Sequence, residues 1–257
     1  MKTILSKDNA KLKRLRMLLK SKKARQESSC FLIESVRALS VFSGAGILPQ
    51  YQLKEVWISN QTDVTGIPAV PEVYRIPHEF MEQLSDCKTS QGVLGVVEFS
   101  GVPFTEFPVH GNFLLADHIT DPGNLGTLIR TAAAFGFSGI FLYGDTVEIF
   151  NPKTVRATMG TLPLMPHWTV DAGIFDLIHS GGYELLSTVV SGGEELSTMT
   201  FGEKNVLAVG SEARGVSPEV LRHAARGISI PMSPAVESLN AAVAGGVCMF
   251  AMQQNLR

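Results

Sequence analysis

The sequence predicts an α/β protein in two parts, the second of which holds a mainly parallel sheet. From residue 111 onward, short apolar runs of strand length alternate with longer segments of helical periodicity, as in βαβ units. Just before that point, residues 100–110 mix glycine and prolines with aromatic residues and are typical of a linker. We therefore expect one domain at residues 1–99 and a second at residues 111–257.

The first part opens on an amphipathic segment whose leucines fall on one helical stripe, with basic residues on the other faces. A second helical segment ends at Gly44, and the remaining short runs are apolar or alternate between apolar and polar residues, as strands do. The predicted helices are 9–23, 35–43 and 77–84, and the predicted strands are 30–33, 55–59 and 93–99.

The second part opens on a strand that leads into Asp121-Pro122, an N-cap followed by a proline at the first helical position. This helix stops at Gly136, and a later helix also opens at a proline, Pro152. The predicted strands are 113–116, 140–143, 183–190, 206–209 and 228–232, and the predicted helices are 122–135, 152–159, 171–179, 218–225 and 239–254.

The composition is that of an ordinary globular protein, with 45% hydrophobic and 18% charged residues. No apolar run reaches the length of a membrane span, and the lysine-rich N-terminus lacks the apolar stretch of a secretory signal, although a transit peptide stays an alternative. Cys30, Cys87 and Cys248 lie too far apart in sequence for a metal-ligand spacing or a disulfide framework. We therefore expect reduced thiols, no bound metal, no membrane contact and a cytoplasmic location.

The net charge of −2 hides an asymmetry between the N-terminus and the rest of the chain. Residues 1–25 carry ten Lys and Arg residues against one acid, whereas the remaining residues carry 12 bases and 23 acids. A basic arm on an acidic body favours a polyanionic partner such as RNA, although a solvated lysine-rich helix face explains the charge equally well. The candidate RNA-binding residues are Lys11, Lys13, Arg14 and Arg25.

Ligands of parallel sheets bind beyond the carboxyl ends of strands, and the first candidate loop, residues 117–126, lies in such a place. Asn124 and Arg130 follow the strand but share one face of a straight helix poorly, because they are six positions apart. Arg130 is a lone cation on an otherwise apolar helix, so it needs either a ligand or an ordinary surface ion pair. His118 in this loop is favoured as a hydrogen-bonded structural residue over a general base.

The second and third candidate loops follow the strands predicted at 206–209 and 228–232. The second, Gly-Ser-Glu-Ala-Arg-Gly at residues 210–215, has small residues that let the backbone approach a ligand closely. The third ends in Ser238 and Asn240, which alone read as helix caps. Each loop by itself also fits an ordinary capped turn. The sequence contains no glycine-rich dinucleotide or phosphate-binding motif, no Gly-x-Ser-x-Gly elbow and no His/Cys metal cluster.

In their order and spacing, the three loops together resemble the signature motifs of the SpoU (TrmH-type) RNA 2′-O-methyltransferases of the SPOUT superfamily. The matching residues are Asp121-Pro122-Gly123-Asn124-Leu125-Gly126 with Arg130, Gly210-Ser211-Glu212 with Gly215, and Ile230-Pro231-Met232 with Glu237-Ser238-Leu239-Asn240. More loosely, the first part resembles the ribosomal-protein-like RNA-binding domain that often precedes this catalytic domain, through Arg25, Phe31-Leu32-Ile33-Glu34 and Gln91-Gly92-Val93-Leu94. One departure is Glu34-Ser35, where the family usually has Glu-Gly.

The resemblance implies a SPOUT domain with a C-terminal trefoil knot, preceded by a small α/β RNA-binding domain. It also implies a homodimer formed through the C-terminal domain, with the active site at the subunit interface. S-adenosylmethionine would be held mainly by backbone groups of the loops at 208–215 and 228–240. The resemblance places Gly210, Ile230 and Leu239 at the cofactor, with Thr188 as a weaker candidate.

The reaction that the resemblance implies is methyl transfer from S-adenosylmethionine to a ribose 2′-hydroxyl of structured RNA, ribosomal RNA being favoured over transfer RNA. The family's catalytic positions fall on Asn124, Arg130, Glu212, Ser238 and Asn240. Because a guanidinium stays protonated, we favour Arg130 as a phosphate clamp, while direct base action with phosphate help stays open. Two alternatives are a catalytically silent RNA-binding or ribosome-assembly factor on the same fold and a Rossmann-type methyltransferase, which would need a glycine-rich first loop.

Overall fold

The computed structural model describes residues 1–63, 65–85 and 90–254. Contacts between Cα atoms divide the chain into two compact units. The first unit comprises residues 1–102 together with residues 148–164, and the second comprises residues 103–147 and 165–257.

The first unit contains a mixed five-stranded sheet in the order β1-β4-β3-β5-β2. β4 runs parallel to both β1 and β3, whereas β5 runs antiparallel to both β3 and β2. β1 and β4 were not predicted from the sequence, and β3 is longer than the predicted strand at 55–59. The strands are β1 (Lys2–Thr3), β2 (Cys30–Glu34), β3 (Tyr51–Ser59), β4 (Glu72–Ile76) and β5 (Val93–Phe99), and the helices are α1 (Ala10–Lys20), α2 (Lys22–Ser28), α3 (Val36–Ser40), α4 (His78–Gln83) and α6 (Pro152–Ala157), with 3-10 turns η1 (Val41–Ser43) and η2 (Leu162–Leu164).

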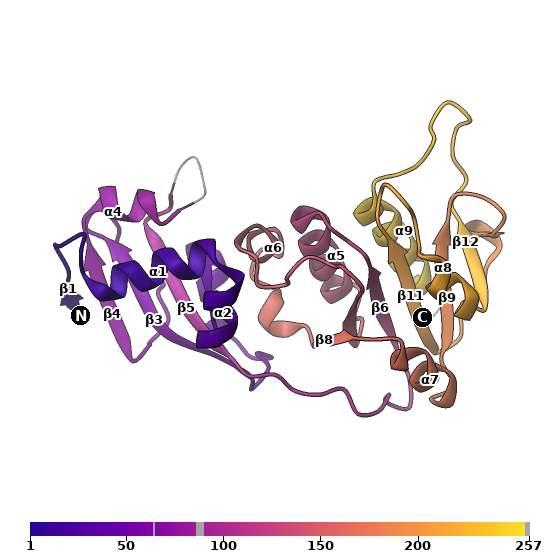
Figure 1. Cartoon of the computed structure of the whole chain (residues 1–257), viewed down its shortest axis with the longest axis horizontal. Helices are drawn as coiled ribbons and strands as arrows, with labels where there is room; N and C mark the ends of the chain where they lie inside the picture. The colour runs from indigo at the N-terminus through magenta and orange to yellow at the C-terminus, as the bar shows by residue number, and fades with distance from the viewer. Residues whose placement is uncertain (64, 86–89, 255–257) are drawn as a thin grey trace. The chain divides into compact units, whose positions relative to one another are not determined.

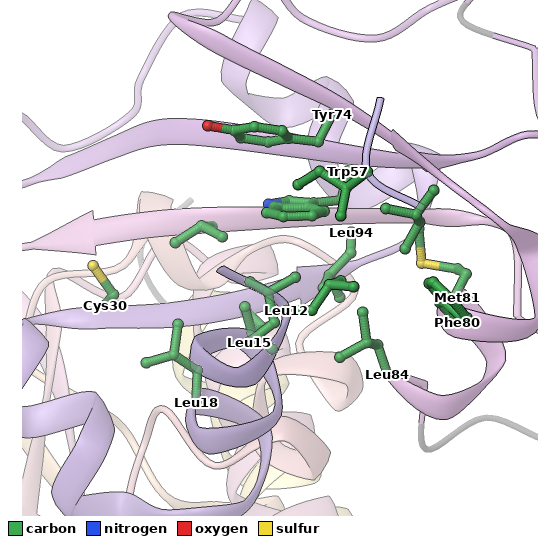
Figure 2. Close-up of a cluster of buried hydrophobic side chains, with 14 residues drawn as sticks. Leu12, Leu15, Leu18, Cys30, Trp57, Tyr74, Phe80, Met81, Leu84 and Leu94 are labelled. Atoms are coloured by element: carbon green, nitrogen blue, oxygen red, sulfur yellow. The ribbon is translucent and has the colours of Figure 1, made fainter. Parts of the chain in front are cut away.

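The apolar stripe of α1 packs on this sheet, as the leucine spacing predicts. Leu12, Leu15 and Leu18 are buried in the same cluster as Trp57 and Tyr74, whose rings stack on each other (Figure 2). The prediction of one continuous helix over residues 9–23 is wrong, because the helix is interrupted at Ser21. That residue has an extended backbone, and its side chain accepts a hydrogen bond from Ala24 N as the N-cap of α2.

Residues 148–164 pack within the first unit, although they follow the second strand of the second unit in sequence. The Glu148 carboxylate forms a buried ion pair with Arg25. The Phe150 ring stacks on Phe31 and Phe99 at centroid distances of 4.8 and 4.0 Å. Aromatic stacking and a buried ion pair thus hold this segment against α2 and β2.

The second unit contains a seven-stranded sheet in the order β10-β12-β9-β11-β6-β7-β8, in which every neighbouring pair is parallel (Figure 1). The predicted α/β class with a parallel sheet is therefore confirmed, while the trefoil knot stays a prediction. The strands are β6 (Gly111–Asp117), β7 (Gly139–Tyr143), β8 (His167–Val170), β9 (Glu184–Val189), β10 (Glu194–Glu195), β11 (Lys204–Gly210) and β12 (Arg226–Ser229), and the helices are α5 (Pro122–Ala134), α7 (Gly173–Ser180), α8 (Pro218–His223) and α9 (Ala241–Gln254), with the 3-10 turn η3 (Leu196–Thr198).

The last central strand begins and ends earlier than predicted. β12 covers Arg226–Ser229 rather than residues 228–232. Pro231 has no N–H to offer a neighbouring strand, so the strand stops before it. The residues between β12 and α9 then run as a long irregular loop (Figure 1). The two strands that the sequence analysis missed here, β8 and β10, lie at the edges of the sheet.

Helices α5 and α9 pack against each other, and α9 also packs against β11. These contacts position the helices next to the loops that follow β6, β11 and β12. The approach is close at Gly245 of α9, where an added Cβ would lie 2.6 Å from Leu128 Cδ2 and 3.2 Å from Val209 Cγ2. On β6 and β11, Phe113, Leu115, Val206 and Ala208 instead belong to the cluster that includes residues of α7 and α8.

Two of the cysteines are buried free thiols, as predicted. Burial raises the pKa of both thiols, that of Cys248 to about 12. Cys87 lies outside the described residues. Within the described ranges, no group of three or more His, Cys, Asp or Glu residues could hold a metal ion, and no helix is long and apolar enough to cross a membrane.

Candidate active site

The three loops singled out in the sequence meet at the carboxyl ends of neighbouring parallel strands. In the register of the sheet, Gly210 at the end of β11 pairs with Asp117 at the end of β6, and Ile228 of β12 pairs with Thr188 of β9. The segments after β6, β11 and β12 therefore leave the sheet on the same side, at the carboxyl ends of the strands. This is the side on which α/β sheets bind ligands.

A cavity of about 400 Å³ opens on this side. Its wall is mainly apolar, with a few hydroxyl, charged and backbone polar groups, as in small-molecule sites of this size. All four residues predicted to hold the cofactor line it, together with two of the predicted catalytic residues. These are Thr188, Gly210, Ile230 and Leu239, and Glu212 and Ser238, respectively.

Asn240 joins the three loops, although it does not line the cavity. Its side-chain amide donates to Asn124 Oδ1 at 3.0 Å and to Glu212 Oε1 at 3.3 Å. Its side-chain oxygen accepts from the backbone N–H groups of Ala242 and Val243 in the first turn of α9. The helix-cap reading of Asn240 is therefore correct, and the same side chain also ties the first two loops together.

Gly210 is required by the path of the backbone. A Cβ at this position would lie 2.1 Å from the carbonyl carbon and oxygen of Gly215 and 2.2 Å from Val216 N. The turn that begins after Gly210 closes on itself, since Gly215 N donates to Ser211 O at 2.8 Å. A side chain at residue 210 would thus displace the loop that lines the cavity.

Arg130 and Asn124 occupy the same helix, α5, in different surroundings. Asn124 lies in the first turn, where its backbone N–H donates to the capping Asp121 side chain at 2.8 Å. Arg130 is exposed, and within the described part of the chain its guanidinium makes no hydrogen bond or ion pair. The ordinary surface ion pair that could have explained Arg130 is therefore not found among these residues, which leaves it available for a ligand.

Asp117 is a site residue to which the sequence analysis gave no role. Its side chain is fully buried, and its Oδ2 accepts a hydrogen bond from Ser217 N at 2.5 Å, which fastens the far end of the second loop to β6. Its Oδ1 has no hydrogen-bond partner among the described residues, and His118 Nε2 lies 3.8 Å away. The other ring nitrogen, His118 Nδ1, accepts from Asp145 N at 3.1 Å, which fits the structural role expected for His118.

Arg214 is a second residue that the sequence analysis passed over. It lies in the turn between Ser211 and Gly215 and lines the cavity beside Glu212. The available signal was a cation among the small residues of the second loop.

The predicted RNA-binding residues of the first unit differ in how strongly their charged groups are engaged by other side chains. Lys13 is exposed, and among the described residues its ammonium pairs only with the exposed Asp8, at 3.3 Å. Lys11 instead bonds Glu72 at 3.1 Å. Hydrogen bonds from Tyr74, Lys11 and Lys2 lower the pKa of that carboxylate to about 2.

The two arginines of the predicted RNA-binding set are engaged within the first unit. Arg14 bonds Glu55 at 2.6 Å. Arg25 is 3% exposed and donates to both carboxylate oxygens of Glu148 and to Leu18 O. The prediction that Arg25 contacts RNA needs correction, because its guanidinium is buried and occupied by these partners.

Comparisons with known proteins give one consistent picture. The SpoU rRNA Methylase family model matches residues 111–250, and the model of the MRM3-like substrate binding domain matches residues 9–95. A tRNA/rRNA methyltransferase of Synechocystis is 28% identical, covering 96% of this chain and 92% of that protein. The 23S rRNA (guanosine(2553)-2′-O)-methyltransferase RlmP of Bacillus subtilis is 28% identical, covering 97% and 98%. The crystal structure of an AdoMet-bound rRNA methyltransferase from Sinorhizobium meliloti has a TM-score of 0.82 at 27% identity and covers 99% and 98%.

Proposed function

Because the chain belongs to the SpoU rRNA methylase family, we propose that it transfers a methyl group from S-adenosylmethionine to a ribose 2′-hydroxyl in structured RNA. Ribosomal RNA is favoured over transfer RNA, since the RlmP relative is named for 23S rRNA. The observation that carries the proposal is the convergence of the three motifs on one cavity, with Asn240 bonded to both Asn124 and Glu212. The Rossmann-type alternative is set aside by the family match.

The cavity fits the cofactor in size and chemistry. Apolar residues such as Ile230 and Leu239 suit the adenosine part, while the exposed backbone of the loop after Gly210 offers polar groups. When bound, S-adenosylmethionine supplies an electrophilic methyl group on a sulfonium. Thr188, Gly210, Ile230 and Leu239 are the residues that would hold it.

The proposed roles of the remaining residues follow from their surroundings. Arg130, exposed and without a partner among the described residues, would grip a phosphate next to the target nucleotide and orient the 2′-hydroxyl. Asn124 and Glu212, held by Asn240, would position the ribose beside the cavity. Ser238 lines the cavity and would fix the third loop against the substrate.

Residues 1–99 form the proposed RNA-binding domain, and residues 100–110 join it to the proposed catalytic domain at 111–257, of which residues 148–164 pack in the first compact unit. The match to a substrate-binding domain model supports this division. The cations proposed to contact RNA are exposed lysines on α1 and at the start of α2. They are Lys13, Lys20, Lys22 and Lys23, of which Lys13 and Lys23 meet only the exposed carboxylates of Asp8 and Glu27 among the described residues.

Homodimerisation through the C-terminal domain is part of the proposal. Val243, Val247 and Phe250 are spaced to lie on one face of α9 and are 52%, 39% and 52% exposed. An apolar helix face of this kind is typical of a protein–protein contact. A cytoplasmic location, where RNA and reduced thiols coexist, fits the same reading.

Two experiments test the proposed function. Calorimetric titration with S-adenosylmethionine separates a methyltransferase from a catalytically silent RNA-binding or ribosome-assembly factor. Mapping of 2′-O-methyl positions in total RNA from a deletion strain then identifies the substrate. The proposal expects cofactor binding and the loss of one methylated ribose. An unchanged methylation map together with no cofactor binding would favour the silent factor.

A further inference from the structure

Arg214 is held at the cavity by a closed turn. Gly215 N donates to Ser211 O, and the turn's base is pressed against Gly210, so the residues between Ser211 and Gly215 have little freedom to leave the cavity wall. Glu212 and Arg214 are the charged residues of this turn, and both line the cavity.

The Arg214 side chain is exposed, and no carboxylate among the described residues pairs with it. Among the described residues that line the cavity, it carries the only positive charge. Glu212, the charged neighbour, is bonded by the Asn240 amide instead. Within the described ranges, the Arg214 guanidinium makes no hydrogen bond or ion pair. Arg226 of the same unit is by contrast paired with both Glu184 and Glu194. The second unit therefore contains carboxylates that pair with arginine, but none of the described ones pairs with Arg214.

We propose that Arg214 binds the carboxylate of the amino-acid part of the cofactor, an inference that rests on the proposed function. A planar guanidinium matches a carboxylate with two parallel hydrogen bonds. The apolar part of the cavity then takes the adenosine, and the charged turn takes the polar end of the molecule. An RNA phosphate is the competing partner, but Arg214 lines the cofactor cavity itself.

The proposal makes Arg214 a determinant of ligand selectivity. Both S-adenosylmethionine and its product S-adenosylhomocysteine keep the carboxylate, so both gain from Arg214. Decarboxylated S-adenosylmethionine lacks the group and should gain nothing.

The test is calorimetric titration of wild-type protein, Arg214→Gln and Arg214→Lys with these three ligands. Arg214→Gln should weaken binding of both carboxylate-bearing ligands by about five-fold, the upper end for an ion pair at an exposed site. Its affinity for the decarboxylated ligand should stay within about two-fold of wild type. Arg214→Lys should fall between wild type and Arg214→Gln. The matched control is Arg222→Gln, which removes an exposed cation from α8 that does not line the cavity.

Two outcomes would overturn the inference, and they differ in what else they affect. If Arg214→Gln loses affinity for all three ligands equally, or for none of them while RNA affinity falls, Arg214 does not bind the carboxylate and the proposed function stands. If wild-type protein binds no S-adenosylmethionine, both the inference and the proposed function fail.

Discussion

The side-chain amide of Asn240 donates a hydrogen bond to the side-chain oxygen of Asn124 at 3.0 Å, across 116 positions of sequence. The same amide reaches Glu212, and the Asn240 oxygen caps α9. One side chain therefore uses its donor to align two loops and its acceptor to begin a helix. These two tasks can be separated by substitution.

Asn240→Asp should keep the helix cap and lose the alignment of the loops. A carboxylate still accepts from Ala242 N and Val243 N and suits a helix N-terminus, so the thermal midpoint should stay near wild type. It cannot donate to Asn124, and it places a second negative charge beside Glu212. We expect turnover to fall by about 10²-fold, as for loss of an orienting group.

Asn240→Ala is the matched comparison, because it loses both tasks. Removing the cap should cost about 1 kcal/mol of stability in addition to the loss of turnover. If the two variants are destabilised equally, the helix cap does not account for a difference in stability between Asn240→Asp and Asn240→Ala. Full turnover in Asn240→Asp would remove the link to Asn124 and Glu212 from the mechanism.

Gly210→Ala should weaken cofactor binding by distorting the loop. The added methyl group would meet the backbone of Gly215 and Val216, which cannot rotate away as a side chain can. We expect at least a ten-fold rise in Kd for S-adenosylmethionine by calorimetry, since the displaced backbone forms the cavity wall. Gly202→Ala is the control, because a Cβ at Gly202 meets no atom within 4 Å. Equal Kd values for wild type and Gly210→Ala would show that the loop adapts.

Ser35→Gly should stabilise the protein. Ser35 has φ 122° and ψ 147°, a backbone conformation that glycine adopts and other residues reach only under strain. Its Oγ caps α3 by accepting from Ala38 N, but glycine is nearly as good a cap, so relief of strain should leave a net gain of about 1 kcal/mol. The urea midpoint of unfolding measures it.

Ser35→Ala supplies the contrast for that measurement. Alanine keeps the Cβ and hence the strain, but it loses the capping hydroxyl, so this variant should be less stable than wild type by about 1 kcal/mol. A midpoint for Ser35→Gly below that of wild type would mean that the backbone at this position is not strained.

The exposed lysines near the junction of α1 and α2 should account for much of the salt dependence of RNA binding. Replacing Lys20, Lys22 and Lys23 by Gln should weaken RNA binding and reduce the slope of log affinity against log salt by about one unit for each phosphate that is no longer neutralised. Lys54→Gln is the control, because Lys54 pairs with Glu98 at 2.8 Å on the sheet. An unchanged slope in the triple variant would mean that these lysines form only a solvated helix face.

To test which part of the first unit binds RNA, charge variants are better suited than removal of residues 1–98. Residues 148–164 pack in the first unit, where Phe150 stacks on Phe31 and Phe99. Cutting away residues 1–98 would remove Phe31 and Arg25, so that Phe150 loses one of its stacking partners and Glu148 loses its ion pair. Loss of activity in such a truncated chain would therefore report misfolding as readily as impaired RNA binding.

The sequence predicted the elements whose signals are local. The leucine stripe of α1 and the Asp121-Pro122 start of α5 both appear where the spacing and the cap place them. The short edge strands β1 and β10 were missed because two residues carry no periodicity. Ser21 was missed because a serine within a basic helical run looks like any other polar position.

The candidate site divides in the same way. The three loops could be singled out because each follows a strand and holds small or capping residues. The link from Asn240 to Asn124, and the burial of Arg25 on Glu148, join residues more than 100 positions apart, which no local pattern reveals. Asp117 was passed over because a carboxylate at a strand end is common, and its partner, Ser217 N, is a backbone group.

The most direct test of the proposed chemistry is transfer of labelled methyl groups from S-adenosylmethionine to ribosomal RNA, followed by alkaline hydrolysis, with wild type and Arg130→Ala compared in single turnover. A 2′-O-methyl group blocks alkaline cleavage, so wild type should place the label in alkali-stable dinucleotides. Arg130→Ala should bind the cofactor normally and transfer methyl groups about 10²–10⁴-fold more slowly, as for loss of an orienting or proton-transfer group. Label in mononucleotides, or a near-normal rate for Arg130→Ala, would contradict ribose methylation guided by Arg130.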